Sequence, residues 1–182
     1  MFLSVLIAVI VTAIVFSVYQ IIKFPGFRVS RSIIIAAPRS TVFTHVDDLR
    51  NWNSWLPWAT LDKDAQVRFE GSTSGSGATL GWSGNAQAGT GNITILDSVT
   101  DESIRLRLEF VRPHPGVTTT EFVFSDAEDQ CRVTWTISGR NNLPARLFAL
   151  YINLDQSVGG PIEDGLTMLK NTLEHRPEAA GD

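Results

Sequence analysis

Residues 103–111 read Ser-Ile-Arg-Leu-Arg-Leu-Glu-Phe-Val, and this stretch decides the fold class. Apolar and charged side chains alternate along it, so Ile104, Leu106, Leu108 and Phe110 share one face of a predicted strand. The opposite face carries arginine and glutamate. One apolar face and one charged face are typical of an antiparallel sheet that is covered on one side only.

The same alternation recurs on both sides of this stretch. Phe122 and Phe124 share a face of the next apolar run, and Trp135 lies on the apolar face of the last one. Strands are predicted over residues 28–36, 65–70, 78–83, 90–98, 103–111, 117–125 and 130–139. The ionisable residues of these strands lie opposite the apolar rows, and we interpret them as surface charges rather than catalysts: Arg68, Arg105, Arg107, Glu109 and Arg132.

Helical spacing flanks the strands. Residues 38–48 predict an amphipathic helix with Pro38 in its first turn, and a short helix or turn follows, which Pro57 ends. Towards the C terminus, residues 143–154 predict a helix, and a last helix reaches about His175. The apolar stripe of this last helix consists of Val158, Ile162, Leu166, Leu169 and Leu173.

Three of the five tryptophans fall within residues 51–58, which read Asn-Trp-Asn-Ser-Trp-Leu-Pro-Trp. Indole rings as close in sequence as Trp52, Trp55 and Trp58 need a large apolar surface to pack against. Two interpretations therefore stand beside each other. The segment is either a structural cover over one end of the core, or the wall of a cavity for an apolar ligand.

Gly159, Gly160 and Gly165 lie along the predicted last helix. Glycine inside a helix costs up to about 1 kcal/mol relative to alanine. Small residues at these positions would thin the helix where it faces the sheet and leave room for a ligand. The alternative for the first two is that, together with Pro161, they mark a helix start or a kink.

The first 22 residues contain no charged side chain. As a helix they would span about 33 Å, which is enough for a bilayer core of about 30 Å. We therefore expect a single-pass membrane anchor over residues 1–22, with a cleaved signal peptide or a buried helix as the alternatives. The positive charges from Lys23 to Arg39 place the larger part of the chain in the cytoplasm. The single cysteine, Cys131, suits a reducing compartment.

The remaining composition excludes several classes of function. A net charge of −4 without a basic stripe gives no indication of nucleic-acid binding. No Cys/His spacing of the metal-binding kind occurs, so neither a metal nor a cofactor is expected. The Gly/Ser-rich residues 71–77 lack the lysine and the helix of a phosphate-binding loop, and we interpret them as a hairpin connection. The spacing predicts no catalytic triad, and His45, His114 and Tyr151 remain as candidates for an enzyme.

Several short motifs follow one another along the chain. They are Arg31-Ser32, Ile35-Ala36-Ala37-Pro38, Trp52-x-x-Trp55-x-Pro57-Trp58, Trp82-x-Gly84-Asn85, Gly89-x-Gly91 and Gly160-x-x-Glu163-x-Gly165-Leu166. Over residues 28–174 the chain resembles the polyketide cyclase/dehydrase and lipid-transport family of the START-like (SRPBCC) superfamily, in its membrane-anchored bacterial form. The resemblance implies an α+β helix-grip fold, in which a curved antiparallel sheet of about seven strands surrounds a long C-terminal helix.

The resemblance also implies a hydrophobic cavity between the sheet and that helix. Residues 1–22 would be a transmembrane anchor, 23–27 a linker, 28–175 the START-like domain and 176–182 a disordered tail. The expected function is non-catalytic binding of a lipid or another hydrophobic small molecule. A cyclase- or dehydratase-like enzyme and a solid-core interaction module without ligand are the alternatives. The residues expected to line the cavity are Trp52, Trp55, Trp58, Trp82, Leu106, Leu108, Phe110, Phe122, Phe124, Trp135, Gly165 and Leu166.

Overall fold

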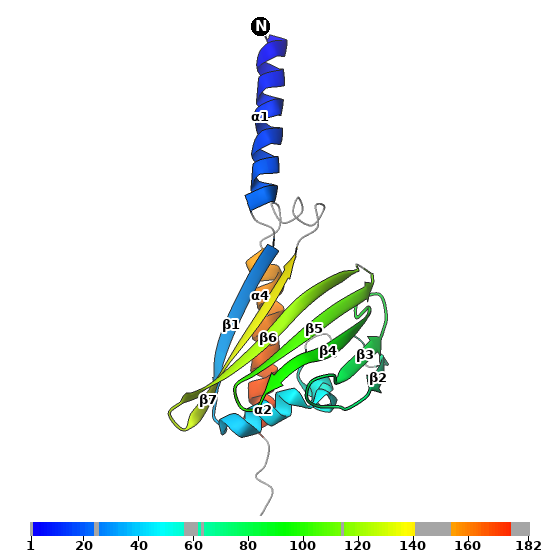
Figure 1. Ribbon diagram of the computed structural model, residues 1–182, viewed down its shortest axis with the longest axis vertical. Helices are drawn as coiled ribbons and strands as arrows, with labels where there is room; N and C mark the ends of the chain where they lie inside the picture. The colour runs from blue at the N-terminus through cyan, green and yellow to red at the C-terminus, as the bar shows by residue number, and fades with distance from the viewer. Residues whose placement is uncertain are drawn as a thin grey trace, which may run out of the picture.

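The computed structural model describes residues 2–23, 26–56, 62, 64–113, 115–140 and 154–175. Within these residues, seven strands form one antiparallel sheet in the order β1-β7-β6-β5-β4-β3-β2 (Figure 1). Strands from β2 to β7 pair with their sequence neighbours, and β1 pairs with β7 at the far edge. The strands are β1 (Gly26–Ile35), β2 (Gln66–Glu70), β3 (Thr79–Ser83), β4 (Thr90–Val99), β5 (Ser103–Arg112), β6 (Gly116–Ala127) and β7 (Gln130–Arg140).

Three helical elements accompany the inner face of the sheet. The long helix α4 (Leu154–Glu174) runs behind β1 and β7, and α2 (Arg39–Asp47) with the 3-10 helix η1 (Leu49–Ser54) lies across one end (Figure 1). The sheet curves around α4, as expected for long antiparallel strands with the usual twist. The predicted α+β helix-grip fold with seven antiparallel strands is confirmed.

The contact between α4 and the sheet is made by the predicted apolar stripe. Ile162, Leu166, Leu169 and Leu173 are buried, and Val158 is half-buried. Steps of three and four residues bring these side chains onto one face of a helix. The prediction of this stripe from spacing alone is confirmed.

The Gly/Ser-rich residues 71–77 connect β2 to β3, as predicted, and a side chain of α2 holds them in place. Asp47 accepts a hydrogen bond from the backbone N–H of Gly75 at 3.0 Å and another from the hydroxyl of Ser98 at 2.7 Å. One carboxylate therefore fixes α2, the loop and β4 relative to one another.

The N-terminal helix α1 (Phe2–Lys23) extends away from the sheet (Figure 1). Crossing a bilayer core takes about 20 consecutive, predominantly apolar residues. Within the part of the chain that the structure describes, no helix is both long enough and apolar enough for that. This finding overturns the predicted transmembrane anchor at residues 1–22 and the single-pass membrane location. The cytoplasmic placement depended on that anchor and is withdrawn with it.

Some predictions concern residues outside those described. The helix predicted over residues 143–154 lies there except for Leu154, and so do Pro57 and the tail from 176 to 182. For the described elements, predicted and observed bounds agree to within about three residues. Within β4 the register changes between Ile95 and Asp97, and Leu96 in between is exposed. Such an irregularity interrupts the alternation on which strand prediction depends.

Candidate functional site

A small cavity of about 10 Å³ lies against the inner face of the sheet. Its described lining comes from four adjacent strands, β4 to β7, and from η1. The lining residues are Trp52, Ile93, Leu106, Leu108, Thr120 and Trp135. The volume is about what a single water molecule needs, and all lining side chains except Thr120 are apolar or aromatic.

Strand register explains why these residues meet. Leu108 lies opposite Ile93 on β4, and Leu106 lies opposite Thr120 on β6. Paired residues of neighbouring strands project from the same face of a sheet. The alternation of β5, with its leucines inward and its arginines outward, therefore places a row of apolar side chains at the floor of the cavity.

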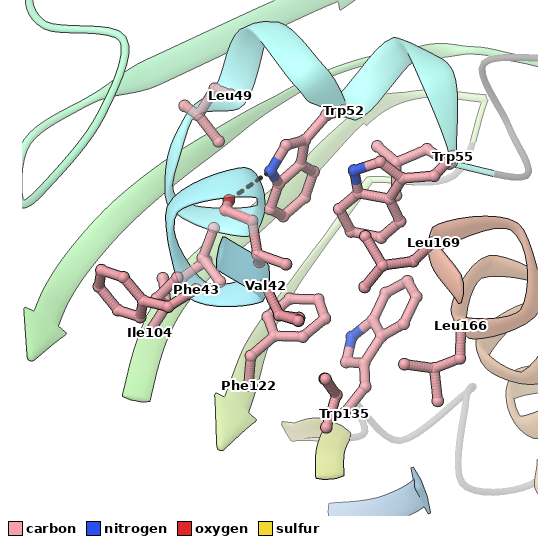
Figure 2. Close-up of a cluster of buried hydrophobic side chains, with 14 of the residues drawn as sticks. Val42, Phe43, Leu49, Trp52, Trp55, Ile104, Phe122, Trp135, Leu166 and Leu169 are labelled. Atoms are coloured by element: carbon pink, nitrogen blue, oxygen red, sulfur yellow. Dashed lines mark hydrogen bonds between the residues drawn. The ribbon is translucent and has the colours of Figure 1, made fainter. Parts of the chain in front are cut away.

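Aromatic rings fill the space beside the cavity. Trp52 and Trp55 have ring centroids 5.0 Å apart, and Trp55 meets Trp135 edge-on at 5.8 Å (Figure 2). Phe122 packs against Trp135 at 4.9 Å. In Figure 2, Leu166 of α4 points into the same cluster. These contacts leave little free volume, which is why the cavity is so small.

A hydrogen bond to the backbone of α2 holds the ring of Trp52 in place. Its indole N–H donates to the carbonyl oxygen of Val46 in α2 at 2.7 Å, shown as the dashed line in Figure 2. The Asp48 side chain accepts a hydrogen bond from the backbone N–H of Arg50 at 3.0 Å and so caps the start of η1. The Arg50 guanidinium also donates to this carboxylate, and its hydrogen bonds hold the pKa of Asp48 below the ordinary value. The tryptophan segment is thus attached to α2 at its first ring.

Thr120 is the polar member of the lining, and its hydroxyl is unusual. The side chain is 4% exposed, and its Oγ1 has no hydrogen-bond partner among the described residues. Thr120 is not among the residues predicted to line the cavity. The sequence does contain the information needed to place it. Phe122 and Phe124 identify the inner face of β6, and Thr120 lies on that face because side chains of a strand alternate.

The structure gives the predicted ligand-lining residues different positions. Trp52, Leu106, Leu108 and Trp135 line the cavity. A second group is buried without lining it: Trp55, Phe122, Phe124, Gly165 and Leu166. Trp82 and Phe110 contact each other edge-on at 5.6 Å, away from the described lining, and Trp58 falls outside the described residues. Ligand contact by any of them stays a prediction.

One glycine of α4, Gly159, serves a different purpose from the one predicted. Gly159 and Gly160 lie inside α4, so they do not start the helix. A Cβ on Gly159 would collide with the guanidinium of Arg31. The room at this position is therefore filled by Arg31 of β1, and the interpretation that Gly159 leaves room for a ligand is wrong.

Arg31 ties the first strand to α4 through two carboxylates. Its guanidinium donates to Asp155 Oδ2 at 2.8 Å and to Glu163 Oε1 at 2.5 Å. The hydrogen bond to Asp155 raises the pKa of Arg31 above its ordinary value, and the hydrogen bond to Glu163 adds to this. The hydrogen bond from Arg31 also holds the pKa of Asp155 below its ordinary value. Both carboxylates are exposed, so the cluster joins β1 to α4 at the surface of the helix.

The described residues offer little for acid–base chemistry at the cavity. No titratable side chain among them lines it. The outward charges of β5 are paired at the surface, as Arg105 is with Asp97 at 3.5 Å. His45 lies half-buried on α2, and His114 and Tyr151 are not among the described residues. In that same part of the chain, no group of three or more His, Cys, Asp or Glu side chains is placed to hold a metal ion.

Comparison with solved structures supports the fold. A truncated norcoclaurine synthase from Thalictrum flavum superposes with a TM-score of 0.64 at 8% identity, over 84% of this chain and 96% of that one. Protein CV1439 from Chromobacterium violaceum gives 0.58 at 16% identity, over 84% and 99%. The Aha1 dimer from Colwellia psychrerythraea gives 0.58 at 14%, over 82% and 97%. Identities this low show a shared fold alone.

Comparison of the sequence itself gives one result. Residues 26–174 match the family model described as polyketide cyclase / dehydrase and lipid transport. No curated protein matches the chain. The matched range begins at β1 and ends with α4, so it contains the complete sheet and its helix.

Proposed function

This chain belongs to the polyketide cyclase/dehydrase and lipid-transport family, and from that premise we propose that it binds a small apolar molecule without transforming it. The proposed site is the cavity between β4–β7 and η1. The single observation that carries the proposal is the lining of this cavity, which is apolar except for one hydroxyl. Sites for small molecules are typically of this kind, mostly hydrophobic with few polar groups.

The proposal requires the cavity to open. At about 10 Å³ it has room for one water molecule, so any organic ligand must displace side chains. Trp52 is the lining residue contributed by η1, whereas the other lining residues belong to paired strands. Moving η1 together with Trp52 and Trp55 enlarges the space without breaking the sheet, although it gives up the hydrogen bond from Trp52 to Val46. Each Å² of apolar surface that the ligand buries then contributes about 25 cal/mol.

The absence of a described titratable group at the cavity supports binding over catalysis. An acid or base within hydrogen-bond reach of the reacting atom is what a cyclase or dehydratase needs. Thr120 offers a hydroxyl, but at neutral pH a threonine hydroxyl acts neither as an acid nor as a base unless a neighbouring base activates it. The binding proposal needs no such neighbour.

A solid-core interaction module is the second candidate function. Its supporting observation is the same small volume, because the rings of Trp52, Trp55, Phe122 and Trp135 fill the interior. In that case the tryptophans serve stability alone. The two candidates predict different results in one experiment.

Native mass spectrometry of the full chain, purified from its producing cells, tests the proposal. A bound molecule of defined mass near one per chain, recovered by organic extraction, is the expected result. A chain that arrives empty and also takes up no apolar probe would contradict it and favour the solid core.

A filled cavity provides the matched control. Ile93→Phe places a larger side chain in the lining, and we expect it to abolish retention of the bound molecule. Ile104→Phe introduces the same change at a buried position of β5 that does not line the cavity. Overpacking costs both variants about 1–3 kcal/mol of stability, so only the loss of ligand separates them.

A further inference from the structure

The Thr120 hydroxyl lacks a hydrogen-bond partner in the described structure although it is buried at the cavity. Its neighbours across the strands are Leu106 on β5 and Ile137 on β7, and Phe122 is the next inward residue along β6. None of these side chains can accept or donate a hydrogen bond. Because buried polar groups are normally paired, an orphan hydroxyl in a native interior calls for an explanation.

We propose that the molecule bound in this cavity carries one uncharged polar group, a hydroxyl or a carbonyl, which hydrogen-bonds to Thr120 Oγ1. This inference rests on the proposed binding function and narrows its ligand class. The ligand is then a compact, mostly apolar molecule with a single neutral oxygen placed towards β6. A threonine hydroxyl can donate to a carbonyl, or accept from a hydroxyl while its own proton stays free to rotate.

The surroundings argue against a charged ligand such as a fatty-acid carboxylate. A carboxylate buried without a cation loses its hydration and gains no partner. No described lysine or arginine lines the cavity. Arg31, which faces α4, already donates to Asp155 and Glu163. The arginines of β5, Arg105 and Arg107, are exposed on the other face of the sheet.

A matched pair of threonines isolates the role of the hydroxyl. Thr118 lies two residues away on the same inward face of β6, and its Oγ1 is likewise buried without a partner among the described residues. It is not part of the described cavity lining. Thr120→Val and Thr118→Val therefore make the same chemical change on the same strand, and only the first removes a polar group from the cavity.

Three probes of similar shape distinguish the ligand classes: p-xylene is apolar, p-cresol adds one neutral hydroxyl, and p-toluate adds a charge. Equilibrium dialysis against the full chain gives the dissociation constant of each. We expect Thr120→Val to weaken p-cresol binding about fivefold, the effect of one neutral hydrogen bond, and to leave p-xylene binding unchanged. Thr118→Val should change neither value. p-Toluate should bind the wild-type chain at least about tenfold more weakly than p-cresol.

The outcomes separate this inference from the binding proposal on which it rests. If p-xylene and p-cresol bind but Thr120→Val weakens neither, the hydroxyl is not the ligand contact and the inference fails alone. The same holds if p-toluate binds most tightly. If the wild-type chain binds none of the probes, the binding proposal fails, and the inference about Thr120 fails as well.

Discussion

The guanidinium of Arg31 on β1 occupies the space that a side chain at position 159 of α4 would need. Gly159 is therefore required by a contact between two distant parts of the chain, and its neighbour Gly160 is not, since a Cβ there would meet nothing within 4 Å apart from its own chain neighbours. Adjacent glycines in one helix thus have different expected responses to the same substitution.

Gly159→Ala should lower the free energy of unfolding by about 1 kcal/mol. Alanine adds up to about 1 kcal/mol of helix propensity, but displacing Arg31 from Asp155 and Glu163 and overpacking the contact cost more than that. Gly160→Ala should change stability less, because the gain in helix propensity is offset by crowding of its Cβ against the ring of Pro161, the next residue. Urea unfolding of both variants checks the pair, and a stabilised Gly159→Ala variant would show that Arg31 moves aside without loss.

The free energy of unfolding should decrease at acid pH, partly because Asp155 becomes protonated. The hydrogen bond from Arg31 lowers the pKa of Asp155 in the folded chain, so its contribution is present above the unfolded pKa of about 4 and is lost as the pH falls through the folded value. Asp155→Asn should lower the urea midpoint at neutral pH and reduce the further fall below about pH 4. Asp164→Asn, on an exposed part of the same helix, is the control. Parallel pH profiles for the wild type and Asp155→Asn would contradict the prediction.

Two tryptophans that touch each other should differ in their tolerance of phenylalanine. Trp52 donates its N–H to Val46, whereas the N–H of Trp55 has no partner among the described residues. Both rings are buried, so Trp52→Phe and Trp55→Phe lose similar apolar volume. We expect Trp52→Phe to cost about 1 kcal/mol more, the net value of one hydrogen bond. Denaturant unfolding measures the difference, and equal losses would mean that the bond to Val46 contributes nothing.

Truncation of Trp55 tests how tightly the aromatic cluster is packed. Its side chain is fully buried and contacts Trp52, Phe122 and Trp135. Trp55→Ala should lower the free energy of unfolding by about 3–5 kcal/mol, as expected when a large aromatic side chain leaves a core. A loss below about 1 kcal/mol would show that η1 already moves away from the sheet in the native ensemble.

Thr120 and Thr136 form a second matched pair, because each is 4% exposed. The Thr136 hydroxyl is hydrogen-bonded to that of Ser30 at 2.9 Å, whereas the Thr120 hydroxyl has no partner in the described structure. Replacing an unpaired buried hydroxyl by a methyl group should stabilise the ligand-free chain by about 1 kcal/mol, and replacing a paired one should destabilise it by a similar amount. Thermal unfolding of Thr120→Val and Thr136→Val checks the signs. A loss of stability in Thr120→Val would indicate an ordered water on its hydroxyl.

Much of the fold could be predicted because it depends on local periodicity. The alternation around Leu106 and the stripe through Leu166 each identify a buried face without knowledge of the rest of the chain. The same alternation places Thr120 on the inner face of β6. A single hydroxyl among apolar residues is recognised only when every residue of that face is considered in turn. The predicted anchor failed because its argument rested on the length and lack of charge of residues 1–22.

The volume of the cavity could not be predicted from sequence. It depends on how the rings of Trp52, Trp55 and Trp135 are oriented after packing, and sequence spacing contains no such information. The role of Gly159 was hidden for a related reason. Its partner Arg31 lies on the first strand, and only the folded structure brings the two together.

The contact between Trp52 and Trp55 also has a spectroscopic consequence. Two indoles with ring centroids 5.0 Å apart and planes inclined by 54° couple their electronic transitions and produce a paired positive and negative band in circular dichroism. Because Trp52 borders the cavity, a molecule that separates the rings changes this signal directly. The chain thus contains an optical reporter of the state of its own interior, readable without a label.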